Sequence, residues 1–305
     1  MSFSLVAALD AQTIVDAIGL GAVYALMAVG IGLVFGVLRL INFAYGQLVM
    51  AGAYTLAFTA SWPVAASIAA CFAVVIALSL VMERAVFRPL RTQSPAVMLV
   101  TTFAIAFLLQ AIALLVDVRD GTLGEIAVSV APLNQAISVG GLDVRKVTIV
   151  AVLVSAALLG LLVLLLVRTT IGLHMRAAAA DFRTARLLGV RANRVITVAV
   201  VLGGVLAATV AVFLTVQNPF VQYTFGLRET IIVLVGVVVG GIDRLWTATL
   251  GGFSIGFASA IINGALPTEK TVYLDSVLFA LVILVLLLRP AGLFARGSAT
   301  GIERV

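Results

Sequence analysis

The sequence contains long apolar runs without a single charged residue, and two of them extend over residues 153–167 and 277–288. The hydrocarbon core of a membrane offers no hydrogen-bond partners to the backbone, so a chain that crosses it forms helices or a closed β-barrel. Barrel strands are short and alternate in polarity, whereas these runs are continuous. The chain is also 63% hydrophobic and 10% charged, which is too apolar for a soluble domain. The sequence therefore predicts an all-α, polytopic integral membrane protein with a single domain over residues 1–305.

Segments of about 20 mostly apolar residues are long enough to cross a membrane as helices. Such segments are expected at residues 13–38, 43–60, 63–82, 95–116, 147–167, 195–216 and 275–289. The region 229–263 holds either one broken span or two short ones, 229–240 and 246–263, around the turn GGIDR. The piece 229–240 is too short to cross alone and is interpreted as a half-helix.

The charges between these segments predict which loops face the cytoplasm, because cytoplasmic loops carry an excess of Lys and Arg. The segment 168–194 holds six arginines and one aspartate, a net charge of +5, and the loop 83–94 and the tail from Arg289 each carry +2. The loop 117–146 has four acids and three bases and is expected outside. An even number of crossings must separate the segment 168–194 from the tail, which favours two spans within 229–263. We therefore expect nine crossings, with eight as the alternative, an external N-terminus and a cytoplasmic C-terminus.

The residues needed for the common kinds of active site are missing from the sequence. One histidine and one cysteine cannot build a metal centre of the usual kind, and neither an HExxH motif nor a Ser/His/Asp set occurs. No GxxxxGK[ST] phosphate-binding loop occurs, so the chain is not expected to bind ATP by itself. We expect no enzyme activity, no catalytic residue, no metal ligand and no bound cofactor. Basic cytoplasmic loops account for the net charge of +6 without a nucleic-acid partner.

Most apolar segments hold no ionisable residue, and Asp16, Asp117, Glu229 and Asp275 fall near the ends of predicted spans. Carriers coupled to protons or sodium ions usually need buried acids near the middle of the membrane. The pattern therefore argues against a chemical step inside the membrane and against ion-coupled transport. Arg228 and Glu229 are interpreted mainly as an interfacial anchor.

The segment 168–194 combines the densest charge of the chain with a helical pattern. Its apolar residues recur at helical spacing, and Gly189 stands where a glycine commonly ends a helix. These features predict a short cytoplasmic helix over residues 175–188. It lies either on anionic lipid or in a groove of a soluble partner, and its alanine-rich face favours the partner, because lipid insertion prefers Trp, Phe and Leu.

Three motifs in order resemble the branched-chain amino acid permeases of ABC importers (LivH-like). Gly172-Leu173, Arg176-Ala177, Asp181, Ala185 and Leu188-Gly189 are similar to the cytoplasmic coupling segment of ABC-importer permeases. INFAYGQLVMAGAY, residues 41–54, is similar to the signature INFA-x-G…M-x-G-x-Y, and ERAVFRPLR, residues 83–91, to the loop ER-x-x-[YF]-RP-x-R. The order and spacing agree from about residue 21 to residue 292.

The resemblance implies a permease subunit that moves branched-chain or similar small amino acids across the bacterial inner membrane. It implies two ABC ATPase subunits that carry ATP and Mg²⁺, a second homologous permease subunit, a periplasmic solute-binding protein and contact with membrane lipid. The residues expected to couple to the ATPase are Arg176, Ala177, Asp181, Phe182, Ala185, Leu188 and Gly189. The residues expected to line the translocation pathway are Asn42, Phe43, Tyr45, Gln47 and Tyr54.

The residues of the 41–54 stretch support a pathway on their own chemistry. Asn42 and Gln47 are uncharged hydrogen-bonding groups among small residues, which suits a zwitterionic or neutral solute better than an ion. The two tyrosines are alternatively interfacial belt residues.

Two departures from the family pattern leave the solute open. Tyr45 stands where the family often has His, and the turn at residues 240–244 replaces the more usual Gly-Gly-x-Gly-Ser. The alternatives are an importer of the same class for amides, urea or another small neutral solute, and a stand-alone facilitator channel. The sequence also leaves open whether the permease pairs with a copy of itself or with a different chain.

Overall fold

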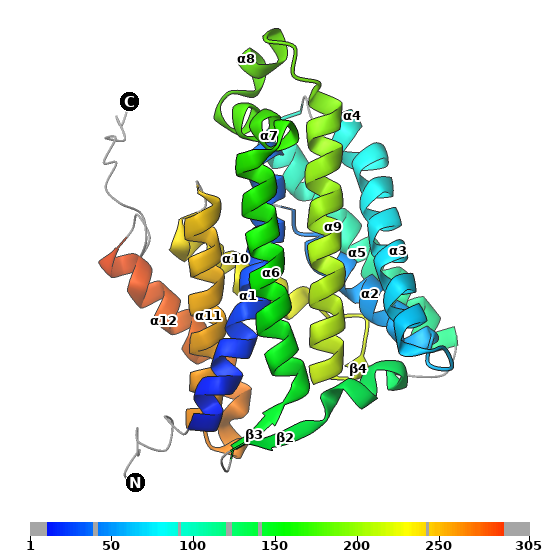
Figure 1. Ribbon diagram of the computed structural model, residues 1–305, viewed down its shortest axis with the longest axis vertical. Coiled ribbons are helices and arrows are strands. Elements are labelled where there is room, and N and C mark those ends of the chain that lie inside the picture. The colour runs from blue at the N-terminus through cyan, green and yellow to red at the C-terminus, as the bar shows by residue number, and fades with distance from the viewer. Residues whose placement is uncertain are drawn as a thin grey trace.

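The computed structural model describes residues 11–38, 42–90, 93–119, 124–139, 142–241 and 244–289 (Figure 1). The α-helices are α1 (Ala11–Leu38), α2 (Tyr45–Phe58), α3 (Val64–Met82), α4 (Arg88–Leu90), α5 (Pro95–Arg119), α6 (Lys146–Arg168), α7 (Thr170–Ala180), α8 (Phe182–Leu187), α9 (Ala192–Gln217), α10 (Leu227–Gly240), α11 (Leu245–Ala265) and α12 (Leu274–Leu288). A π-helical turn, η2 (Glu83–Phe87), joins α3 to α4, and two 3₁₀ segments are η3 (Val128–Asn134) and η4 (Thr268–Tyr273). The strands are β1 (Glu125–Ile126), β2 (Ala136–Val139), β3 (Leu142–Arg145) and β4 (Phe220–Val221).

The structure confirms a predominantly α-helical protein with several membrane-spanning helices. Among the described residues, seven helical stretches are long and apolar enough to cross a membrane, and they contain α1, α3, α5, α6, α9, α11 and α12. The predicted segments 43–60 and 229–240 form the helices α2 and α10, each of 14 residues. At about 1.5 Å per residue these two helices are too short to cross a core of about 30 Å. The prediction that 43–60 is a full helical span is therefore wrong.

The region 229–263 contains two helices, as the charge argument favoured. α10 ends at Gly240 and α11 begins at Leu245, and Ile242 and Asp243 of the predicted turn lie outside the described residues. α11 has 21 residues and is long enough to span by itself. Ile41, Arg91 and the predicted tail beyond Arg289 also lie outside the described residues.

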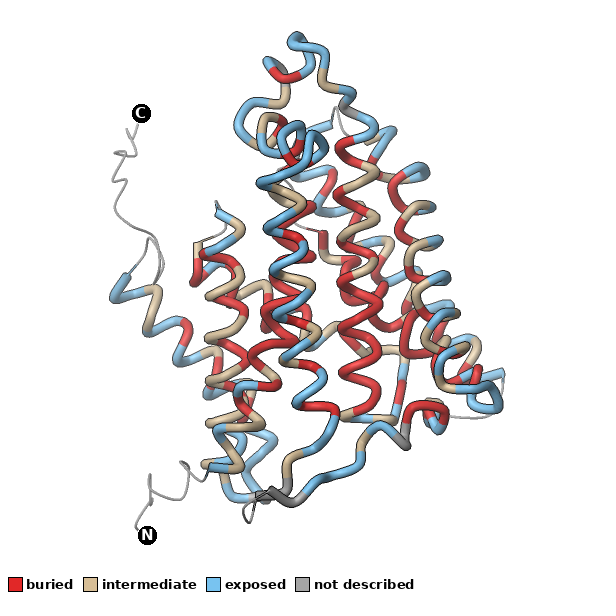
Figure 2. Tube along the Cα trace, viewed as in Figure 1, coloured by how far each residue is buried: buried red, intermediate tan, exposed pale blue. Residues whose placement is uncertain are grey.

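α1 and α9 form the buried centre of the bundle, whereas α3, α5, α6 and α12 expose most of their spans (Figure 2). The glycines of the GxxxG pair Gly252 and Gly256 let α11 approach α1. A β-carbon on Gly256 would lie 2.9 Å from the Cα of Gly21, and one on Gly252 would lie 2.7 Å from the backbone oxygen of Tyr24. Close backbone approach therefore holds these two helices together.

The close contact predicts a stability defect when Gly252 gains a methyl group. Gly252→Ala should lower the free energy of unfolding by about 1–3 kcal/mol, the usual cost of overpacking. Gly36→Ala is the control, because its β-carbon would meet no atom within 4 Å and alanine favours a helix over glycine. Thermal unfolding in detergent measures both, and equal melting temperatures would contradict the packing.

The two short helices begin beside each other near mid-depth in the bundle. The Tyr45 hydroxyl, at the start of α2, donates to the carbonyl oxygen of Gly203, which lies midway along α9. A β-carbon on Gly46 would lie 2.5 Å from the carbonyl oxygen of Gly226, the residue before α10. Gly226 has a φ of 81°, a left-handed conformation that glycine adopts without strain. Glycine thus permits the two helix starts to meet.

The described residues of the predicted external loop 117–146 cover one end of the bundle (Figure 1). β1 pairs antiparallel with β4, and β2 and β3 form a hairpin. The Ser129 hydroxyl of η3 donates to the carbonyl oxygen of Leu56 at 2.7 Å, which satisfies an open carbonyl near the end of α2. This strand-bearing end lies opposite α7 and α8 (Figure 1).

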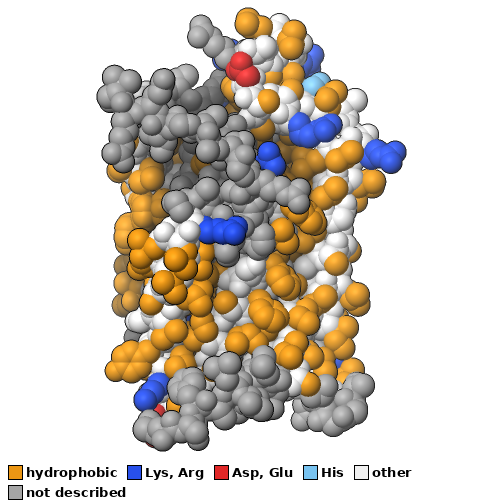
Figure 3. All heavy atoms as spheres, turned by 90° about the vertical axis from the view of Figure 1, so that its left-hand side faces the viewer, with side chains coloured by type: hydrophobic (Ala, Val, Ile, Leu, Met, Phe, Trp, Pro, Cys, Tyr) orange, Lys and Arg blue, Asp and Glu red, His pale blue; other side chains and the backbone are white. Residues whose placement is uncertain are grey.

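The surface agrees with a bundle that sits in a membrane. The face shown in Figure 3 carries hydrophobic side chains across its middle, and Lys and Arg side chains gather mainly toward its upper end. That upper end is the α7–α8 end, where exposed arginines include Arg84, Arg88, Arg168, Arg176, Arg186, Arg191 and Arg194.

Candidate functional site

The segment 168–194 forms two short helices, α7 and α8, rather than the single helix predicted over 175–188. α7 begins earlier, at Thr170, because the hydroxyl of Thr169 accepts a hydrogen bond from the backbone N–H of Gly172. The chain breaks at Asp181, which has extended φ and ψ angles, and the carboxylate of Asp181 accepts from the backbone N–H of Thr184 at the start of α8. Asp181 is therefore the N-cap of α8, a role that its short acidic side chain favours.

The predicted end of the segment at Gly189 is confirmed. Gly189 has a φ of 88°, and the backbone N–H of Val190 donates to the carbonyl oxygen of Ala185. This hydrogen bond closes the last turn of α8 in the way that a left-handed glycine allows.

The residues expected to couple to an ATPase divide into two groups by burial. Ala185 is buried, Ala177 and Phe182 are half-buried, and Phe182 packs against the core. The outward-facing residues are Arg176, Asp181, Leu188 and Gly189. The sequence prediction overlooked Leu187, although 83% of Leu187 and 80% of Leu188 are exposed. Two adjacent exposed leucines between exposed arginines suit contact with a protein partner or with lipid.

The residues expected to line a pathway are fixed inside this single chain. Tyr54 donates its hydroxyl to Asp117 at 2.7 Å, Phe43 stacks on Phe103 with ring centroids 4.0 Å apart, and Tyr45 binds α9 as described above. These contacts give the three aromatic residues structural roles in positioning α2 against α5 and α9.

Asn42 and Gln47 differ in how their polar atoms are satisfied. The side-chain oxygen of Asn42 accepts a hydrogen bond from the backbone N–H of Ala44, which shapes the turn into α2. Gln47 is fully buried, and neither its amide nitrogen nor its amide oxygen has a hydrogen-bond partner among the described residues. A buried amide without partners is costly, so Gln47 is the residue of this group whose polar atoms remain available to a ligand or water.

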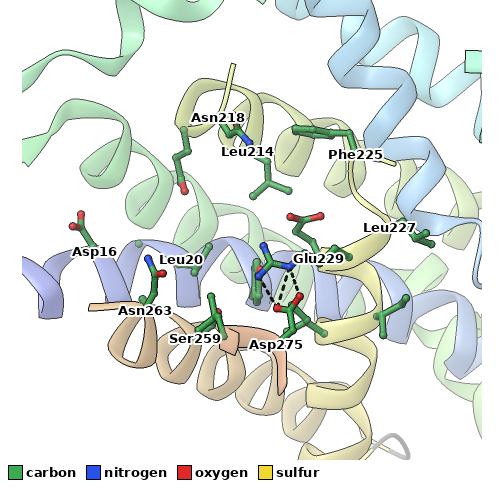
Figure 4. Close-up of a pocket in the computed structure, with 18 of the residues that line it drawn as sticks. Asp16, Leu20, Leu214, Asn218, Phe225, Leu227, Glu229, Ser259, Asn263 and Asp275 are labelled. Atoms are coloured by element: carbon green, nitrogen blue, oxygen red, sulfur yellow. Dashed lines mark hydrogen bonds and ion pairs between the residues drawn. The ribbon is translucent and has the colours of Figure 1, made fainter. Parts of the chain in front are cut away.

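A cavity of about 870 Å³ lies at the strand-bearing end of the bundle, and we refer to it as the vestibule. Its walls come from the starts of α1, α6, α10 and α12, the ends of α9 and α11, and the segment around β4 (Figure 4). Its volume falls within the range of small-molecule sites. None of the five predicted pathway residues lines it.

The vestibule holds charged groups of both signs. Arg228, in the first turn of α10, donates from Nε and Nη2 to the carboxylate of Asp275 on α12, with Nε 2.8 Å from Oδ2. Glu229 is half-buried and points into the vestibule beneath Leu214 (Figure 4). The backbone N–H groups of Gly226 and of Glu229 itself favour the charged form of this carboxylate. This pattern, with Glu three residues after the N-cap, resembles half of a capping box.

Comparison with known proteins decides the family. The model of the branched-chain amino acid transport system permease component matches residues 13–287. The chain belongs to this permease family. It is 31% identical over 298 residues to the high-affinity branched-chain amino acid transport system permease protein BraD of Pseudomonas aeruginosa, covering 93% of this chain and 95% of the relative. It is 29% identical over 301 residues to the corresponding protein LivH of Salmonella typhimurium and of Escherichia coli, with the same coverage. No solved structure matches it.

Within this permease, Arg228 and Glu229 are cavity-lining residues that the sequence did not identify as such. Their interpretation as an interfacial anchor stays a prediction, and the structure adds that Arg228 and Glu229 lie on the wall of a cavity. The available signal was an adjacent pair of opposite charges directly before the apolar run 230–240, since ionisable residues inside a membrane segment usually mark a functional site.

Proposed function

We propose that this chain is the membrane-spanning permease subunit of an ATP-driven ABC importer for branched-chain or similar small amino acids. The observation that carries the proposal is the match to branched-chain amino acid permeases over 93% of the chain. The chain itself carries neither an ATP site nor a bound cofactor in this proposal, so the energy comes from separate ATPase subunits that hold ATP and Mg²⁺.

The proposed partners occupy opposite ends of the permease. Two ATPase subunits serve the complex, and one of them binds α7 and α8 through Leu187, Leu188 and the neighbouring arginines. A periplasmic binding protein delivers the solute to the strand-bearing end, and a second homologous permease completes the membrane part. The exposed leucines at one end and the cavity at the other support this arrangement.

The proposed topology keeps nine crossings of the bacterial inner membrane. Residues 42–44 before α2 and residues 218–226 before α10 are non-helical, and each extends a 14-residue helix that is too short to cross alone. Non-helical backbone at membrane depth is tolerated where protein buries it, and the starts of both helices lie inside the bundle. The arginine-rich α7–α8 end then faces the cytoplasm.

Reconstituted transport tests the proposal. The permease, its second permease, the ATPase and the binding protein are placed in proteoliposomes, and uptake of radiolabelled leucine is measured. We expect uptake only with ATP and the binding protein together, and none with an ATPase whose phosphate-binding lysine is replaced. Uptake without ATP would contradict the proposal and favour the facilitator channel, and uptake of urea or an amide but not leucine would reassign the solute.

The glycine after α8 gives a sharper test of the cytoplasmic segment. Gly189→Val should reduce leucine uptake several-fold, because a β-branched residue at a φ of 88° costs about 1–2 kcal/mol and shifts the turn. Gly160→Val on α6 is the matched control, since a β-carbon at either glycine would meet no atom within 4 Å. Equal uptake by the two variants would show that the turn at Gly189 is not needed for coupling.

A further inference from the structure

Glu229 and Arg228 present opposite charges side by side in the vestibule. Both stand in the first turn of α10, and both line the cavity. A free amino acid carries one ammonium and one carboxylate group on the same carbon, so it needs an acceptor and a donor close together. Consecutive residues at a helix start supply that pairing.

Glu229 retains acceptor capacity for a ligand. A carboxylate offers about four lone-pair positions, more than the two backbone N–H groups of Gly226 and Glu229 beside it can occupy. The remaining positions are available to a cation in the vestibule, into which the carboxylate points (Figure 4). An ammonium group fits this site by charge.

Arg228 is held in place by Asp275 but retains donors of its own. Its Nε and Nη2 bind the carboxylate, and its Nη1 makes no hydrogen bond to any described residue. Because the two side chains are 54% and 39% exposed, the ion pair contributes little to folding stability. The ion pair with Asp275 orients the guanidinium group of Arg228, and the remaining N–H groups suit the carboxylate of a ligand.

The rest of the vestibule is apolar enough for an aliphatic side chain. Leu20 and Tyr24 of α1, Leu214 of α9 and Phe225 before α10 line it together with the charged residues. Leu214 and Glu229 face each other across the cavity in Figure 4, so charged and apolar walls lie within reach of one small molecule.

The geometry points to the vestibule as a binding site for a free α-amino acid with an aliphatic side chain, in which Glu229 binds the ammonium group and Arg228 the carboxylate. This inference rests on the proposed function and assigns the residues that receive the solute at the strand-bearing end. Asp275 acts as a positioning residue that holds Arg228.

Equilibrium binding of radiolabelled leucine tests the site, with the permease–ATPase complex in lipid nanodiscs and the binding protein left out. Glu229→Gln removes the charge but keeps the helix cap, since Gln serves at this position of a capping box as Glu does. We expect it to weaken leucine binding by about 10- to 100-fold, the loss typical of a hydrogen bond between charged groups. Glu269→Gln, at an exposed glutamate of η4 outside the vestibule lining, is the control and should bind leucine as the wild type does.

Two leucine analogues separate recognition from folding. The 2-oxo acid of leucine lacks the ammonium group, and 3-methylbutylamine lacks the carboxylate. The wild type should prefer leucine to both, and Glu229→Gln should lose the preference for leucine over the oxo acid. The double variant Arg228→Gln/Asp275→Asn, which removes both charges of the ion pair, should lose the preference over the amine.

The outcomes distinguish this inference from the proposed function. Leucine binding that is equal in Glu229→Gln and Glu269→Gln overturns the site, and so does an equal loss of leucine and oxo-acid binding. Absence of leucine binding to the wild-type complex, while proteoliposomes take up leucine, also overturns the site but leaves the function standing. Absence of ATP-driven leucine uptake by the wild type overturns the function itself.

Discussion

Replacing both Leu187 and Leu188 with aspartate is expected to abolish binding of the ATPase and to reduce leucine uptake at least about 100-fold, because two carboxylates enter an apolar contact at its centre. Both leucines are exposed by 80% or more, so the permease loses almost no packing of its own. Its melting temperature and membrane insertion should therefore stay unchanged. Copurification of the ATPase with a tagged permease measures the effect directly.

The control for this double variant is a charge placed at an equally exposed apolar residue of the opposite end. Val272 of η4 is 85% exposed, and Val272→Asp should leave copurification of the ATPase intact. A permease that retains the ATPase despite both aspartates would contradict docking through α8.

A double variant with lysine at both leucine positions distinguishes a protein partner of α8 from a lipid surface. If α8 lies on anionic lipid, Leu187→Lys/Leu188→Lys should retain activity, because basic residues strengthen attachment to that surface. If α8 fills a groove of the ATPase, the lysines should be as harmful as the aspartates. We expect equal harm, because in the proposed docking the two leucines enter an apolar contact, which excludes a charge of either sign.

The positions of the helices could be predicted from the sequence, because a long apolar segment that enters a membrane forms a helix. Every apolar segment identified in the sequence became a helix, including both pieces of 229–263. The length of the apolar segment 43–60 did not reveal that α2 starts only at Tyr45. The apolar residues continue through the turn in which Asn42 accepts a hydrogen bond from Ala44. Composition reports what lipid tolerates, whereas a helix start depends on a local hydrogen bond.

The break between α7 and α8 had a signal in the sequence that the apolar periodicity concealed. Asp181 followed by Thr184 is a typical N-cap pattern, and the hydroxyl of Thr184 also donates to the Asp181 carboxylate. The apolar spacing continues across the break, so the pattern of a single helix and of two short helices looks alike.

The vestibule depends on contacts between distant parts of the chain, which a single sequence does not specify. Arg228 and Asp275 are 47 residues apart and belong to different helices. Their positions near span ends were visible in the sequence, but which acid meets which base follows from how α10, α11 and α12 pack.

The second large effect is expected at the junction of the two short helices, where Gly226→Val should leave little or no folded permease. The substitution places a β-branched residue at a φ of 81°, at a cost of about 1–2 kcal/mol. Its β-carbon would also lie 2.6 Å from the carbonyl oxygen of Gly46, which adds about 1–3 kcal/mol for overpacking. Together these costs are a large share of the stability of an ordinary protein.

Size-exclusion chromatography in detergent measures the folded, monodisperse fraction of this variant. Gly160→Val serves as the control again, because it adds the same side chain where no atom lies within 4 Å. A folded yield for Gly226→Val equal to that of the control would mean that the starts of α2 and α10 do not touch. The vestibule would then lose its inner wall, since the first turn of α10 carries Arg228 and Glu229 and is held in place by the contact between Gly226 and Gly46.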